Sequence, residues 1–321
     1  MTELEDRLRG GLLGLLVGDA LGVPYEFKAP AELPGPEQLE LCPPEGFARS
    51  HAGVPPGTWS DDGAQALCLL ESLISTSTFD AEDFGQRLLR WYEAGHLAVD
   101  GLVFDVGVQT ADALRRLRLG SSAGPRSLAP VGSNGNGSLM RVLPLALWHR
   151  GDDAALVRDA FASSAVTHPH ARARLCCALY CLWVRGLLRG REDAWPAAVA
   201  ALRSHLAGDP ELTAELEFHV RPDDPPQGAG SGYVVDSLRS ARWAFERGSY
   251  EAVVKAAIGL GRDTDTTAAI AGGAAGVRDG LGAIPQRFLA ALRGRSLVEP
   301  LLDALVLHAL RPLDSDGGRA P

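Results

Sequence analysis

Two carboxylates separated by a single residue stand in the last third of the chain, in the segment IGLGRDTDTTAAIAGGAAG (258–276). Asp263 and Asp265 are flanked there by threonine hydroxyls, and the alanines and glycines that follow are typical of a closely packed helix. Like charges this close repel each other, and burial strengthens the repulsion. A hard divalent cation such as Mg²⁺ or Mn²⁺ would offset it, because these ions bind carboxylate and hydroxyl oxygens. The same residues could also simply cap the helix.

A second acid pair, Asp61 and Asp62, occurs in the segment GTWSDDG (57–63). Ser60 precedes the pair, and apolar residues at helical spacing follow it. A helix cap is again possible, with Ser60 at the N-cap and the acids in the first turn. Two such clusters, each at a helix start, favour one shared metal site over two separate caps. A shared site requires the first and last thirds of the chain to meet, so we expect a single domain over residues 1–312.

Three further segments of the chain carry groups that could act on a substrate. Glu26 follows the first expected helix and is either a solvated loop acid or a group that faces a site at the helix end. Asp105 precedes an amphipathic helix and by itself is typical of a cap. His168 and His170 flank Pro169, and a structured turn is favoured over a metal site because no HExxH motif or cysteine pair completes the ligand set.

A loop rich in glycine and asparagine precedes the middle of the chain. Its last part comprises Gly132, Ser133, Asn134, Gly135, Asn136 and Gly137. Glycines allow positive φ angles and let backbone N–H groups approach an anion such as a diphosphate. No GK[ST] sequence follows, so the loop is not a Walker motif. The asparagines could equally be ordinary turn residues.

The composition favours a mostly helical protein and argues against some partners. Of the 321 residues, 46% are hydrophobic, and Ala, Leu and Gly dominate over alternating β-branched residues. The net charge of −9, without a basic cluster, argues against binding to nucleic acid or an anionic membrane. No uninterrupted apolar run reaches the roughly 18 residues that a membrane span needs. The odd count of five cysteines, without framework spacing, indicates a reducing, cytoplasmic setting.

These groups must be positioned by helices, whose places the apolar spacing predicts. Besides those that follow the acid pairs and Asp105, we expect helices over residues 3–22, 80–93, 152–164, 175–183, 234–247 and 249–260. Glycines recur along residues 3–22 and would weaken that helix unless it packs closely against another. Cys176, Cys177 and Cys181 are expected in the core, and residues 313–321 are expected to be a disordered tail.

The order of these motifs resembles that of the ADP-ribosylglycohydrolase family. The resemblance spans about residues 8–290 and rests on GDALGVPYEF, GTWSDDG, FDVGVQTADAL, GSNGNGSLMRVLPLAL, THPHARA and GRDTDTTAAIAGGAAG. It implies an all-α orthogonal bundle with a binuclear site for two divalent cations, Mg²⁺ or Mn²⁺. It also implies hydrolysis of the glycosidic bond at the distal ribose anomeric carbon of an ADP-ribosylated protein or a related ADP-ribose conjugate. We expect a monomer.

The resemblance also implies roles for residues by their position. The metal ligands would be Ser60, Asp61, Asp62, Asp263, Asp265 and Thr266. The catalytic set would comprise Asp105 beside the scissile bond, Asp62 at the metals, and Glu26 on a loop that closes over the site. Residues 132–137 would lie along the diphosphate and ribose, and His168 near the nucleotide.

Four positions depart from the family pattern. Ser60 replaces a threonine but keeps the hydroxyl, whereas Gly63 replaces a threonine and loses it. Val108 stands where close relatives have asparagine, and Arg262 replaces a common glycine. The metal set is intact and the substrate set is altered, so arginine-linked ADP-ribose is not assumed. The alternatives are a non-catalytic ADP-ribose-binding or structural relative, and a hydrolase of O-acetyl-ADP-ribose.

Overall fold

Helices account for the regular secondary structure of residues 1–120 and 134–312, the part of the chain that this computed structural model describes. The α-helices are α1 (Glu3–Gly22), α2 (Asp61–Thr76), α3 (Ala81–Ala94), α4 (Val108–Arg118), α5 (Leu143–Trp148), α6 (Asp153–Ala165), α7 (Ala171–Leu188), α8 (Ala194–Leu206), α9 (Pro210–Glu215), α10 (Val234–Phe245), α11 (Tyr250–Gly259), α12 (Thr264–Asp279), α13 (Gln286–Ala291) and α14 (Arg295–Leu310). Within these ranges the one β contact is an isolated bridge between Gly135 and Tyr233. The predicted all-α class is confirmed.

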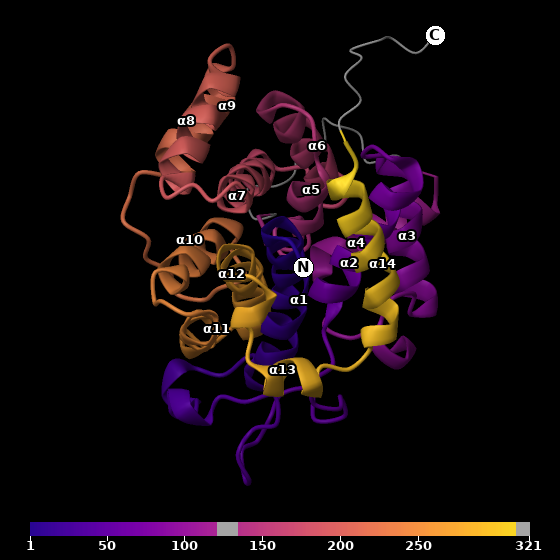
Figure 1. Cartoon of the computed structure of the whole chain (residues 1–321), viewed down its shortest axis with the longest axis vertical. Coiled ribbons are helices and arrows are strands. Elements are labelled where there is room, and N and C mark those ends of the chain that lie inside the picture. The colour runs from indigo at the N-terminus through magenta and orange to yellow at the C-terminus, as the bar shows by residue number, and fades with distance from the viewer. Residues whose placement is uncertain (121–133, 313–321) are drawn as a thin grey trace.

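Helices α1 and α12 pack against each other in the middle of the bundle (Figure 1). A Cβ atom added to Gly10 would lie 2.2 Å from the carbonyl oxygen of Gly276, and one added to Gly18 would lie 2.2 Å from that of Ala268. Because the order of contacts is reversed between the two helices, they run antiparallel. Only glycine allows backbones this close, so the predicted close packing of the glycine-rich first helix is confirmed.

This packing brings the end of α1 to the start of α12. A Cβ atom on Gly22 would lie 2.4 Å from the Cα atom of Asp265. The Thr264 hydroxyl also donates a hydrogen bond to the Gly22 carbonyl oxygen, at 2.8 Å. The chain then passes through a short 3₁₀ turn (Val23–Tyr25). Glu26 therefore follows directly beside the acidic start of α12.

The other helices surround this central pair. Helices α10 and α11 pack on α12, α7 contacts α6 and α8, and α2 contacts α3, α5 and α14 (Figure 1). Their buried apolar side chains form one cluster that extends from Leu8 to Val306. The first and last thirds of the chain thus meet, as predicted. The domain limit at residue 312 and the disordered tail stay predictions, because residues 313–321 lie outside the described part.

Most predicted helices agree with the structure within a few residues, but α7 is longer than the expected 175–183. It begins earlier because the His170 ring caps it, with Nδ1 accepting a hydrogen bond from the Arg172 N–H at 3.2 Å. The three cysteines of α7 are buried, as predicted. None of the helices in the two described stretches combines the length and the apolar character needed to cross a membrane.

Candidate active site

A cavity of about 320 Å³ lies where the loop after α1, the starts of α2, α4 and α12, and the loop before α5 converge. Its lining includes most of the predicted site residues, namely Glu26, Asp61, Asp105, Gly135, Asn136, Gly137, His168, Asp263 and Thr266. The predicted Gly132 and Ser133 lie outside the described residues, so their role stays a prediction.

The two acid pairs meet at the starts of α2 and α12. The Thr266 hydroxyl lies 3.3 Å from Asp62 Oδ1, and the Thr266 N–H donates to Asp265 Oδ1 at 2.9 Å. Asp61, Asp62 and Asp265 are at most 4% exposed. The Oδ2 atoms of Asp62 and Asp265 are buried and have no hydrogen-bond partner among the described residues. Buried oxygens of this kind fit a cation, because a buried acceptor without a partner is otherwise destabilising.

The helix-cap interpretation is right for Ser60 and wrong for the Asp263 side chain. Ser60 Oγ accepts a hydrogen bond from the Asp62 N–H at 3.2 Å, as an N-cap hydroxyl does. One lone pair of that oxygen remains for a cation. Asp263 stands at the N-cap position of α12, but its side chain accepts none of the helix N–H groups. Its Oδ2 atom instead accepts from Asn136 Nδ2 at 2.8 Å, at the cavity wall.

Burial and mutual repulsion raise the pKa of the acids at this site. For Asp61, Asp62 and Asp265, burial is the largest cause of a pKa well above the usual value, and neighbouring carboxylates add to it. Burial and nearby carboxylates also raise the pKa of Asp105 to about 7 and that of Glu26 to about 10. Such a cluster is fully ionised only when cations neutralise it, which favours a divalent metal centre.

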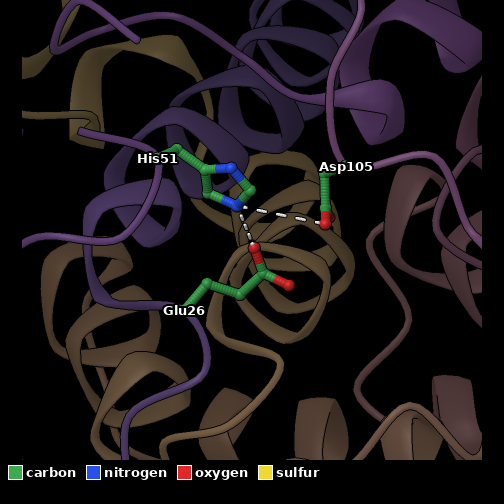
Figure 2. Close-up of side chains that lie close together, drawn as sticks. All are labelled: Glu26, His51 and Asp105. Carbon is green, nitrogen blue, oxygen red and sulfur yellow. Dashed lines mark hydrogen bonds and ion pairs between the residues drawn. The ribbon is translucent and has the colours of Figure 1, made fainter. Parts of the chain in front are cut away.

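Glu26 lies buried against His51 (Figure 2). Glu26 Oε2 is 2.6 Å from His51 Nε2, and that nitrogen is 3.9 Å from Asp105 Oδ1. Glu26 also groups with Asp263 and Asp265, with one oxygen of each within 4.8 Å of the others. The solvated-loop interpretation of Glu26 is therefore wrong, and the site-facing interpretation is right. His51 was not predicted from the sequence, because it stands in an aperiodic loop without a motif of its own.

Asp105 does not cap α4. Gly107 holds the N-cap position, and Asp105 itself has a left-handed backbone with φ of 57°. Figure 2 shows the Asp105 carboxylate directed toward His51 and Glu26. A non-glycine residue in this conformation is strained, and such strain concentrates at functional sites. The backbone thus presents Asp105 to the cavity instead of to the helix.

Asp19 is a buried site residue that the sequence did not single out. Its two carboxylate oxygens accept hydrogen bonds from the N–H groups of Ser60 at 2.9 Å and Gly63 at 2.8 Å. Asp19 therefore ties the start of α2 to α1. Burial, the largest cause, raises its pKa to about 7, against the lowering effect of these hydrogen bonds. The signal in the sequence is an acid inside the apolar stretch of the first helix.

The Gly/Asn loop forms one wall of the cavity, but its two described glycines do not need the positive φ angles that were expected. Neither Gly135 nor Gly137 has a positive φ. A Cβ atom at Gly137 would lie 2.9 Å from His168 Cε1, so glycine lets the ring of His168 lie against the loop. Asn136 Nδ2 donates to Asp263 as described and also to Ser237 Oγ at 2.9 Å. Asn136 is therefore a structural link across the cavity and not a plain turn residue.

His168 and His170 take separate positions. His168 is 2% exposed and lines the cavity, and its backbone N–H donates to the Ser164 carbonyl oxygen at 2.7 Å. His170 caps α7 instead. The structured-turn interpretation of this segment is confirmed, and the two rings do not share a metal site.

Gly63, one of the four departures from the family pattern, is explained by packing. A Cβ atom there would lie 2.7 Å from Leu16 Cδ2 and 2.8 Å from the Trp59 ring. The position has no room for the family's threonine side chain in this structure.

Of the other departures, Val108 lies at the rim of the site and Arg262 directly precedes the site residue Asp263. Val108 is 79% exposed and lines the cavity. Arg262 is exposed and donates from Nη1 to the Ala229 carbonyl oxygen at 2.5 Å, and its own carbonyl accepts from the Phe27 N–H at 2.6 Å. Arg262 therefore pairs with the loop that carries Glu26.

Comparison with known proteins agrees with this geometry. The family model for ADP-ribosylglycohydrolase matches residues 1–314. An ADP-ribosylarginine hydrolase Tri1 of Pseudomonas putida (strain GB-1) is 33% identical over 287 residues, which cover 88% of this chain and 73% of that protein. The ADP-ribosyl-[dinitrogen reductase] glycohydrolase of Rhodospirillum rubrum is 29% identical over 297 residues, which cover 90% of this chain and 91% of that protein.

A solved structure described as an ADP-ribosylglycohydrolase-related protein complex superimposes with a TM-score of 0.76 at 33% identity, over 97% of this chain and all of that one. The likeness thus extends over the sequence and the fold together. The chain belongs to the ADP-ribosylglycohydrolase family and is a hydrolase.

Proposed function

We propose that this protein is a metal-dependent ADP-ribosylhydrolase that cleaves the glycosidic bond at the anomeric carbon of the distal ribose. The observation that supports this most is the meeting of the α2 and α12 acid pairs beside the cavity. Asp62 and Asp265 each have a buried oxygen without a hydrogen-bond partner among the described residues. A bound cation would supply the partner that both buried oxygens lack.

Two divalent cations, Mg²⁺ or Mn²⁺, fit this donor set. The proposed ligands are Ser60, Asp61, Asp62, Asp263, Asp265 and Thr266. Carboxylate and hydroxyl oxygens are the donors these ions prefer. When bound, the cations would neutralise the carboxylates, attract the ribose hydroxyls and make a nearby water easier to deprotonate.

Asp105 is proposed to manage the proton of the reaction. Hydrolysis forms a bond from a water oxygen to the anomeric carbon while the bond to the leaving nitrogen or oxygen breaks, through an oxocarbenium-like state. The water loses one proton and the leaving group gains one. Burial raises the pKa of Asp105 above that of an ordinary carboxyl group, which suits it to take up and release this proton. Asp62 would act from the metal centre, and Glu26 would close the site beside Asp105.

ADP-ribose is proposed to lie along residues 132–137, with its diphosphate near the loop and His168 near the nucleotide. Gly135, Asn136 and Gly137 of this loop line the cavity together with His168, and both glycines lie against the His168 ring. By their names, the two relatives described above act on ADP-ribosylarginine and on ADP-ribosylated dinitrogen reductase. For this chain we propose an ADP-ribosylated protein as substrate. The linkage is left to experiment, because Val108 alters the rim where the linked group would lie.

The test is release of free ADP-ribose from a panel of substrates. The panel contains arginine-linked and serine-linked ADP-ribosyl peptides and O-acetyl-ADP-ribose, each with Mg²⁺, Mn²⁺ or a chelator. We expect turnover of at least one substrate with metal and none with chelator, and no turnover by Asp265→Asn. Binding of free ADP-ribose without any turnover would favour the non-catalytic alternative. Absence of both binding and turnover would overturn the proposed function.

A further inference from the structure

Arg141 is a fully buried cation at the end of the Gly/Asn loop. Across the described stretches of the chain, no carboxylate forms an ion pair with it, and burial lowers its pKa to about 10, so it is still charged at neutral pH. The guanidinium instead donates to Gln65 Oε1 at 2.6 Å and to Thr167 Oγ1 at 2.7 Å, and it packs 5.1 Å from the Phe84 ring centre. Burying a charge without an opposite charge beside it is destabilising, so the two neutral hydrogen-bond partners indicate a function for Arg141.

Gln65, the first hydrogen-bond partner of Arg141, contacts the proposed metal ligand Asp61. A guanidinium has only donors, so the oxygen of the Gln65 amide must face Arg141. The amide nitrogen is then turned to Asp61, where Nε2 donates to Oδ2 at 2.7 Å. Arg141 therefore fixes, through Gln65, which oxygen of Asp61 is occupied and which is free.

Thr167, the second hydrogen-bond partner of Arg141, contacts His168 on the opposite wall of the cavity. Because Thr167 Oγ1 accepts from Arg141, its own proton must go elsewhere, and the acceptor within reach is His168 Nδ1 at 2.7 Å. Nδ1 is then an acceptor, and the ring proton is on Nε2. Nε2 faces the glycine wall, where Cβ atoms on Gly135 and Gly137 would lie 3.5 Å and 3.2 Å from it. Burial, and next the charge of Arg141, lower the pKa of His168 to about 3, so the ring is neutral.

We infer that Arg141 is a positioning residue that sets both walls of the cavity at once. Through Gln65 it orients Asp61, and through Thr167 it holds His168 as the tautomer that carries hydrogen on Nε2. His168 therefore offers the ligand a hydrogen-bond donor, and the ligand atom that it recognises must be an acceptor, such as a ribose or phosphate oxygen. The identity of that ligand rests on the proposed function, whereas the tautomer does not.

The tautomer is measured directly by ¹⁵N NMR on histidine-labelled, ligand-free protein, with His168→Gln used to assign the signal. We expect a protonated Nε2 and an unprotonated Nδ1 in the unmodified protein. Thr167→Val removes the hydroxyl and should allow the other tautomer, and it should weaken ADP-ribose binding with Mg²⁺ present by roughly 5- to 10-fold, the scale of one hydrogen bond. Thr167→Ser keeps the hydroxyl and should retain both properties.

A separate variant tests the contact from Arg141 through Gln65 to Asp61. Gln65→Met should weaken Mn²⁺ binding while the His168 signal keeps the same tautomer, which a general loss of structure would not do. A proton on Nδ1 in the unmodified protein would overturn the inference, and so would an unchanged tautomer and affinity in Thr167→Val. If His168 has the expected tautomer but ADP-ribose does not bind, the proposed function fails and the role of Arg141 stands.

Discussion

Replacing Gly18 by alanine tests whether the contact between α1 and α12 holds the proposed metal site together. The new Cβ atom would lie 2.2 Å from the Ala268 carbonyl oxygen. The two helices must then separate by about 1 Å, and overpacking of a tight core costs roughly 1–3 kcal/mol. Alanine also favours the helix over glycine by about 1 kcal/mol, which offsets part of that cost.

Separation of α1 from α12 should disturb the proposed metal site, because the two halves of that site are held by different helices. Asp19 in α1 holds the start of α2, and Asp265 and Thr266 belong to α12. Metal–ligand distances normally lie within about 0.2 Å of their preferred values, so a larger shift of one helix should weaken the site. We therefore expect Gly18→Ala to lower Tm by several degrees, at roughly 2–4 °C per kcal/mol, and to weaken Mn²⁺ binding.

The matched control is Gly259→Ala, at an exposed helical glycine whose added Cβ atom would meet nothing within 4 Å. It should raise Tm slightly, through helix propensity alone, and leave Mn²⁺ binding unchanged. Thermal unfolding and calorimetric Mn²⁺ titration of the two variants measure both effects. A Gly18→Ala protein that resembles the control would refute the close contact and its link to the site.

Three further predictions concern the acids and their neighbours. Asp265→Asn should reduce metal content and turnover together, whereas Asp105→Asn should keep its metal and lose roughly 10²- to 10⁴-fold in turnover; metal analysis beside a turnover assay separates the two. The raised pKa of Asp61 and Asp265 means that the folded metal-free protein retains protons that the unfolded chain releases, so its Tm should fall as the pH rises above the ordinary aspartate pKa of about 4. Added Mg²⁺ should restore Tm most at the high end, and a Tm that rises with pH in chelator would contradict this. Gly63→Thr should lower Tm without improving Mn²⁺ affinity, because its Cβ atom would lie 2.7 Å from a Leu16 methyl group. A gain in Mn²⁺ affinity would contradict this, since it would show that a threonine hydroxyl at position 63 can contribute to metal binding.

Local sequence patterns were sufficient for the helices that carry the acids. A hydroxyl or acid followed by an apolar stripe predicts a helix start, because the unsatisfied N–H groups of the first turn donate hydrogen bonds to such oxygens within a few residues. The start of α2 after Ser60 agrees with this expectation. The glycines of α1 predict a close neighbour, because they weaken a helix that has none.

The same patterns were not sufficient for the chemical state of the residues. Glu26 and Asp105 each looked like an ordinary loop acid or cap, and both lie in the cavity. His51 stands outside every motif, and the motif that contains Arg141 does not reveal its partners; Glu26 and Gln65, the partners of these two residues, stand 25 and 76 residues away in the chain. Burial and through-space charge decide their hydrogen bonds and pKa values, and neither can be read from neighbours in sequence.

The sequence by itself therefore determined the helices, the two acid pairs and the family to which they belong, since helix starts and caps depend on contacts within about one turn. Only the tertiary structure decided that the acid pairs share one cavity, because that required the glycines of α1 to meet α12 in antiparallel order. It also decided that Asp19 anchors α2 and that Arg141 reaches both walls. These contacts join residues far apart in the chain, and their energies depend on distance and burial in space.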